Sequence, residues 1–124
     1  MPPSLVSIDL KVAMYLANLA DLQDAGVSHN QNIRKKVLLS PNTIDHLVYL
    51  SHAVFPPGET AETHHHQDMT EIFYISSGSA QVTVDGKNFE CPTGSCIAIE
   101  PHEQHRLSNT SNDDLVILYL GLHA

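Results

Sequence analysis

The sequence predicts a single domain of the all-β class, on three observations. First, the segments after residue 35 are short runs rich in β-branched, aromatic and aliphatic residues. Second, turn signals such as Pro-Pro-Gly and Asp-Gly separate these runs at close intervals. Third, 124 residues suffice for one hydrophobic core but not for two domains. We therefore expect one domain over residues 1–124, with a barrel or sandwich of strands over about residues 35–122 and an N-terminal arm over about residues 1–34.

The N-terminal arm has a weak helical pattern. Within residues 9–24, Leu10, Met14, Leu16 and Leu19 fall at nearly helical spacing, which favours a short helix. An extended arm is the alternative. Gly26 ends the pattern in either case.

The later segments have the composition and the boundaries of β-strands. The clearest signal is the pair Asp85 and Gly86, which suits the two-residue turn of a hairpin. Proline and glycine turns end most of the other segments. The predicted strands cover residues 35–39, 45–55, 70–76, 80–84, 87–91, 96–99, 105–108 and 115–120.

The charge balance excludes two classes of partner. The formal net charge is -8, with 14 acidic and 6 basic side chains. A nucleic-acid binder needs a basic surface, and an anionic membrane repels an acidic one. The apolar stretch from Val12 to Ala20 is short and is interrupted by Asn18, so it resembles neither a signal peptide nor a membrane span. We therefore expect a cytoplasmic protein.

Three of the six basic residues are consecutive, at Arg34, Lys35 and Lys36. One interpretation is the solvated start of a strand. The other is a local cationic patch that meets an acidic substrate or a partner chain.

Three consecutive histidines begin the segment with the clearest chemistry. On a strand, His64 and His66 share one face and His65 points the opposite way, so the first two can form a bidentate metal site. Glu71 follows a short turn, where the next strand can add a carboxylate. The best candidate for a fourth ligand is His105, which opens a later predicted strand. A solvated histidine-rich loop is the alternative, but it does not explain the carboxylate and glycines at fixed offsets.

Those offsets resemble the first sequence motif of the cupin superfamily. Gly58–Gly78 matches it without a gap: Gly, five residues, His-x-His, four residues, Glu, six residues, Gly. The segment Gly94–Asn109 resembles the second motif, with its first glycine, His105 and Asn109 at the family spacing. The usual Pro-x-Gly of the second motif is altered, and His102 stands where its glycine is common.

The resemblance implies a small cupin barrel of antiparallel strands with a metal ion inside, near one mouth. It implies His64, His66, Glu71 and His105 as the ligands of one divalent ion per chain. Three imidazoles and a carboxylate suit Fe, Mn, Ni or Zn. Four ligands on a six-coordinate ion leave two positions for water, substrate or O₂, which is typical of a catalytic site.

Other residues are candidates for the surroundings of the ion. Because its pKa would lie near working pH, His102 is a candidate general acid or base, although a loop histidine is usually only solvated. Phe73 and Ile75 share the face of Glu71, so they are expected to line a cavity or pack the core. Tyr49 and His52 also fall in a predicted strand that can line the cavity.

These observations lead to two functional expectations. The first is a metal-dependent enzyme that acts on a small polar metabolite as a dioxygenase, isomerase, cyclase or lyase. The second is a non-catalytic module that binds a metal and a small ligand. A sugar-phosphate isomerase would need a cationic cradle, for which only residues 34–36 and Arg106 are at hand. Exposed sheet edges and an apolar arm also favour a homodimer.

Overall fold

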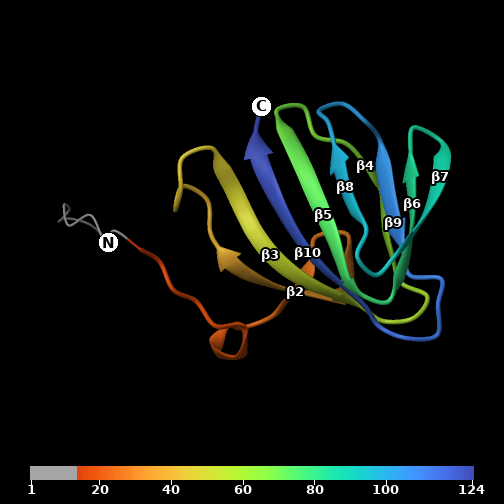
Figure 1. The fold of residues 1–124 in the computed structure, drawn as a ribbon, viewed down its shortest axis with the longest axis horizontal. Coiled ribbons are helices and arrows are strands. Elements are labelled where there is room, and N and C mark those ends of the chain that lie inside the picture. The colour runs from red at the N-terminus through yellow and green to blue at the C-terminus, as the bar shows by residue number, and fades with distance from the viewer. Residues whose placement is uncertain (1–13) are drawn as a thin grey trace.

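The computed structural model describes residues 14–124 and contains ten β-strands with one short 3-10 turn before them (Figure 1). The predicted all-β class is therefore confirmed. No helix in this part of the chain is long and apolar enough to cross a membrane. The elements are η1 (Leu19–Asp21), β1 (Ala25–Val27), β2 (Asn30–Leu39), β3 (Leu47–Phe55), β4 (Thr60–His64), β5 (Met69–Ser77), β6 (Ser79–Val84), β7 (Lys87–Pro92), β8 (Cys96–Ile99), β9 (His105–Ser108) and β10 (Leu115–His123).

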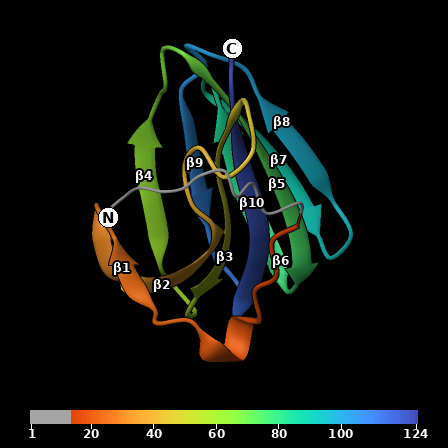
Figure 2. The same ribbon diagram turned by 90° about the vertical axis from the view of Figure 1, so that its left-hand side faces the viewer.

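The strands form two antiparallel sheets. The larger sheet has the order β1-β2-β3-β10-β5-β8, and the smaller has the order β4-β9-β6-β7. Figure 1 shows β3, β10 and β5 side by side in the larger sheet, and Figure 2 shows the β1–β2 hairpin at one edge of the molecule near β4. The chain passes from one sheet to the other several times, so residues distant in sequence face each other across the interior.

Alternate residues on the strands point into the space between the sheets and form the core. Ile75 and Leu115, for example, are almost completely buried, and each such side chain contributes roughly 1.5–3 kcal/mol of hydrophobic stabilisation. The core cluster consists of Ile33, Ala53, Phe55, Phe73, Ile75, Ala80, Val82, Cys91, Ile99, Leu107, Leu115 and Ile117.

The expected N-terminal helix is not formed in the described residues. Residues 14–18 have no regular secondary structure, and the next three form a single 3-10 turn. The Asn18 side chain accepts a hydrogen bond from the Ala20 amide at 2.9 Å and so caps this turn. Met14 and Leu16 stay exposed, and a short helix without a buried face is marginal in water. Residues 9–13 of the expected helix lie outside the described residues.

The first strands begin earlier than the sequence pattern indicates. Residues 25–34, which we assigned to the arm, form β1 and the first half of β2. The run from Asn30 to Asn32 is polar and lacks the alternating apolar pattern of a strand, so the sequence does not indicate the start of β2. Both asparagine side chains donate to the Glu59 carboxylate, at 2.8 and 3.3 Å, so they attach the hairpin to the start of β4.

Two glycines of the first motif occupy turns that require left-handed backbone. Gly58 has φ 84° and Gly78 has φ 85°. A Cβ atom on Gly78 would lie 2.5 Å from the carbonyl oxygen of Asp114, whereas a Cβ atom on Gly58 would meet nothing within 4 Å. Backbone conformation explains the first glycine, and both conformation and space explain the second.

We therefore expect Gly78→Ala to destabilise the protein more than Gly58→Ala. Gly58→Ala should lower the free energy of unfolding by about 1–2 kcal/mol, because alanine is strained in the left-handed conformation. Gly78→Ala should lose the same amount and, in addition, the cost of the close contact between its Cβ atom and Asp114. Urea unfolding of the two variants measures both losses. Equal losses would show that the backbone at Asp114 moves away from the added Cβ atom without a cost in stability.

Candidate metal centre

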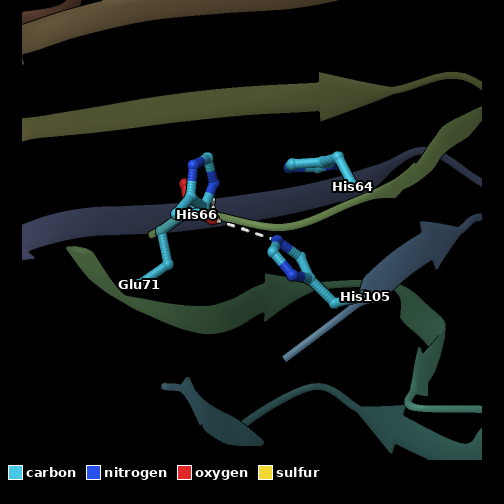
Figure 3. Close-up of side chains that lie close together, drawn as sticks. All are labelled: His64, His66, Glu71 and His105. Atoms are coloured by element: carbon cyan, nitrogen blue, oxygen red, sulfur yellow. Dashed lines mark hydrogen bonds and ion pairs between the residues drawn. The ribbon is translucent and has the colours of Figure 1, made fainter. Parts of the chain in front are cut away.

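Three segments bring the four predicted ligands together (Figure 3). His64 ends β4 and His66 lies two residues further on, while Glu71 lies in β5 and His105 begins β9. β4 and β9 are paired so that His64 lies opposite His105. The short turn from β4 to β5 then carries Glu71 back to the same place.

The potential ligand atoms of these four side chains all lie within 4.8 Å of one another. Oxygen Oε1 of Glu71 lies 3.2 Å from Nε2 of His66 and 3.2 Å from Nε2 of His105. Glu71 and His105 are buried, and the other two histidines are half-buried. The arrangement is a His3Glu group of the kind that can hold a metal ion.

The histidine tract has the two faces that strand alternation predicts. His64 and His66 have ring centroids 5.1 Å apart and both belong to the group, whereas His65 is exposed. The alternation continues past the last residue of β4.

Backbone carbonyls orient two of the imidazoles. Nδ1 of His64 lies 2.8 Å from the carbonyl oxygen of Glu62, and Nδ1 of His105 lies 3.1 Å from that of Glu103. An Nδ1–H that donates to a carbonyl leaves the lone pair of Nε2 available to a metal ion. In both cases the acceptor is two residues earlier, so the local backbone sets the orientation of the ring.

Tyr49 orients the carboxylate. Its hydroxyl donates a hydrogen bond to Oε2 of Glu71, whereas two of the imidazoles contact Oε1. Both residues lie opposite Gly121 on the intervening strand β10. A Cβ atom on Gly121 would overlap the sulfur of Met69 and lie 3.3 Å from the Tyr49 ring, so the glycine leaves room for both side chains. The sequence indicates Tyr49 as a lining residue, but its bond to Glu71 depends on a strand order that the sequence does not reveal.

Electrostatics favour an ionised carboxylate among imidazoles. Burial alone raises the pKa of Glu71, but hydrogen bonds from His105 and Tyr49 and the nearby imidazoles outweigh it and lower that pKa below its ordinary value. Burial lowers the pKa of His64, which keeps its ring neutral. Burial also lowers the pKa of His105, but the hydrogen bond to Glu71 dominates and raises it.

The group opens onto a cavity of about 370 Å³ between the sheets. His64, His66 and Glu71 are among the residues that line it. His105 is not among them and is fully buried. Most of the wall is apolar or aromatic, and it includes Phe55, Phe73, Leu107, Ile117 and Tyr119.

The other sequence candidates fall in different places. Phe73 lines the cavity and stacks on Tyr119 with centroids 5.7 Å apart, whereas Ile75 belongs to the core and not to the cavity wall. His52 is absent from the cavity wall. His102 is exposed at φ 73°, and its amide donates to the carbonyl oxygen of His66 at 2.6 Å, so its backbone supports the loop that carries a predicted ligand.

We expect Tyr49→Phe to weaken metal binding about 10–100-fold, because it removes the only hydroxyl that holds Oε2 of Glu71 among the described residues. Tyr119→Phe is the matched control. Its hydroxyl belongs to the same cavity wall and makes no hydrogen bond to Glu71. Competition with a chromogenic chelator measures both affinities. Equal affinities in the two variants would contradict the role of the Tyr49 hydroxyl.

Comparison with known proteins identifies the fold and the family. A family model described as a cupin domain matches residues 51–121. An uncharacterized protein of Methanocaldococcus jannaschii is 36% identical over 69 residues, which cover 56% of this chain and 55% of that protein. The match therefore spans about half the length of this relative.

Solved structures give the same result for the fold. A predicted oxalate decarboxylase from Thermotoga maritima has a TM-score of 0.82 and 22% identity, over 89% of this chain and 100% of that chain. The polyketide cyclase RemF from Streptomyces resistomycificus has a TM-score of 0.76 and 21% identity, over 88% and 79% of the two chains. Both motifs, the two-sheet architecture and the family model agree, and the chain belongs to the cupin family.

Proposed function

We propose that this cupin is a metal-dependent enzyme that acts on a small molecule bound in the cavity. One divalent ion of Fe, Mn, Ni or Zn is held by His64, His66, Glu71 and His105. The observation that carries the proposal is that three of these four side chains line the cavity of about 370 Å³. A purely structural ion would instead be enclosed by protein on every side.

The residues fit such an ion by the chemistry of their donor atoms. Three imidazoles and one carboxylate, with no thiolate, suit the borderline divalent metals. His66 and His105 already direct Nε2 toward Glu71, each at 3.2 Å from Oε1. A bound ion supplies Lewis acidity and exchangeable coordination positions.

The chain's own residues supply the rest of the site. Tyr49 orients Glu71, and the apolar wall limits the access of water to a bound substrate. Burial raises the pKa of Tyr119 to about 12, so its hydroxyl stays protonated and can donate a hydrogen bond into the cavity. His102 remains a proposed acid or base only for a substrate that extends to its exposed turn.

The reaction class is oxygenation, isomerisation, cyclisation or lysis. The solved structures with this fold include a predicted oxalate decarboxylase and a polyketide cyclase, so the fold carries more than one chemistry. An isomerase for sugar phosphates has little support, because Arg34, Lys36 and Arg106 do not line the cavity. A non-catalytic carrier of a metal and a small ligand is the second candidate. The mostly apolar cavity wall suits a bound ligand in such a carrier as well as a substrate in an enzyme.

The spectrum of the Co(II)-substituted protein tests the enzyme proposal. Azide and cyanate should change its visible absorption, because exchangeable positions accept small anions. Oxygen uptake by the Fe(II) form should then be measured against a panel of metabolites. A Co(II) spectrum that no small ligand changes would contradict a catalytic centre and leave a closed metal site.

We further propose that the chain forms a homodimer through the outer face of the larger sheet. Leu50, Val54, Leu118 and Leu120 alternate with inward-facing residues on β3 and β10, and all four are only partly buried. Tyr74 on the neighbouring strand is 43% exposed. A second copy would cover this apolar face. Sedimentation equilibrium should give twice the chain mass, and a monomer at micromolar concentration would contradict the proposal.

A further inference from the structure

The three consecutive basic residues are divided between the two faces of β2. Arg34 forms an ion pair with Asp24 at 3.2 Å, and Lys36 donates to the carbonyl oxygen of Leu19 at 3.0 Å. Lys35 alternates with them and lines the cavity, next to the buried position of Ile33. Neither sequence interpretation holds for the whole triplet, since only the middle residue faces the interior.

Lys35 has no acidic partner among residues 14–124. The ion pairs found in this part of the chain involve Arg34, His66 and His105. Glu71 is the other charged group on the cavity wall, and its oxygens are engaged by imidazoles and by Tyr49. Lys35 is half-buried as a residue and is a basic side chain on a mostly apolar wall, so a bound anion would find in it an ion-pair partner that no acidic group of residues 14–124 occupies.

The same hairpin adds a second polar group at the rim. His29, in the turn from β1 to β2, lines the cavity and is exposed, and its ring centroid lies 5.9 Å from that of His64. The aromatic part of the wall is built from Phe73, Tyr119 and Tyr49. Tyr119 stacks on Phe73 and meets the Tyr49 ring edge-on at 5.6 Å.

We propose that the cavity binds a small organic carboxylate with an aromatic or aliphatic body, and that Lys35 determines this specificity. The ammonium group pairs with the carboxylate, and the body packs on the aromatic wall. A cavity of about 370 Å³ lies in the size range of small-molecule sites. One lysine suits a monoanion, whereas a phosphate dianion needs several convergent donors.

This inference rests on the proposed function for the place of the ligand, but Lys35 is not a metal ligand. The test can therefore separate the two. Benzoate and hexanoate serve as probes, and benzamide and hexanamide are their neutral counterparts. Binding is measured by calorimetry on metal-free and on Zn(II)-loaded protein, for the wild type, Lys35→Met, Lys35→Arg and Lys36→Met. The last variant is the matched control, because Lys36 is adjacent on the same strand and outside the cavity wall.

In the wild type each carboxylate should bind about tenfold more tightly than its amide, as expected for a hydrogen bond to a charged group. Lys35→Met should lose about tenfold in carboxylate affinity and leave amide affinity unchanged. Lys35→Arg should retain most of the preference, which also shows that position 35 tolerates substitution. Lys36→Met should behave as the wild type.

Several results would overturn the inference. The first is unchanged carboxylate affinity in Lys35→Met, and the second is an equal loss of carboxylate affinity in Lys36→Met. The others are the failure of every probe to bind the wild type and tighter binding of phenyl phosphate than of benzoate. Metal content of the same samples separates this inference from the proposed function. Protein that binds zinc but shows no effect of Lys35 contradicts the inference alone. Protein whose benzoate binding depends on Lys35 but that takes up no metal contradicts the proposed function alone.

Discussion

His64→Ala and His66→Ala are expected to lose bound metal, and His65→Ala is expected to keep it. The first two changes remove imidazoles whose ligand atoms lie within 4.8 Å of those of Glu71 and His105. His65 is exposed on the other side of the same tract. Metal affinity typically falls roughly 10–100-fold when a residue that hydrogen-bonds to a ligand is mutated, and removal of a ligand itself should lower the affinity further.

The three variants form their own control, because they remove the same kind of side chain from adjacent positions. His65→Ala should also change the free energy of unfolding by less than about 0.5 kcal/mol, as exposed substitutions usually do. Metal content after identical reconstitution and desalting measures the effect. A similar, modest loss in all three variants would indicate a flexible tract in which any two histidines bind, and would refute the assignment of His64 and His66.

Asn109→Ala is expected to cause the largest loss of stability. The Asn109 side chain is 1% exposed, and its amide nitrogen donates to the carbonyl oxygens of Phe55 at 2.9 Å and Asp113 at 2.8 Å. Its Oδ1 accepts hydrogen bonds from the amide and the hydroxyl of Ser111. The backbone of Asn109 also pairs with that of Gly58 and Glu59, so this residue joins the second motif to the first.

Truncation leaves the Phe55 carbonyl buried without this donor and opens the loop before β10. At about 1–3 kcal/mol for each buried group left unsatisfied, the free energy of unfolding should fall by roughly 2–5 kcal/mol. Asn88→Ala is the control, because Asn88 is exposed on β7 and accepts one hydrogen bond from Thr83. It should cost under about 1 kcal/mol. Urea unfolding measures both, and equal losses would contradict the structural role of Asn109.

Local patterns in the sequence predict that His64, His66 and Glu71 lie together, whereas His105 joins them through the pairing of β4 with β9. Strand alternation separates His65 from its neighbours, and the short turn returns Glu71 to the same face. The strand boundaries are also close. Residues 96–99 and 105–108 match β8 and β9, and the other predicted strands differ from the observed ones by up to five residues at their ends, whereas β1 and β4 are absent from the predicted strand ranges.

The cavity wall is much harder to predict, because it depends on which strands are neighbours. Tyr49 reaches Glu71 only because β3 and β5 both pair with β10 and Gly121 lies between them. The β1–β2 hairpin is hidden by polar residues whose side chains bind Glu59. That hairpin carries Lys35 and His29. The sequence indicates Lys35 only as one of three basic residues that could meet an acidic substrate or a partner chain, and it contains no signal that places His29 at the cavity.

The metal content of the wild-type protein tests the central claim most directly. Protein stripped of metal and reconstituted separately with Fe(II), Mn(II), Ni(II) and Zn(II) should retain about one ion per chain with at least one metal after desalting, because the chain offers one His3Glu group among the described residues. Elemental analysis against protein concentration gives this ratio. Protein that retains none of the four metals would contradict the account of the site and the function proposed from it.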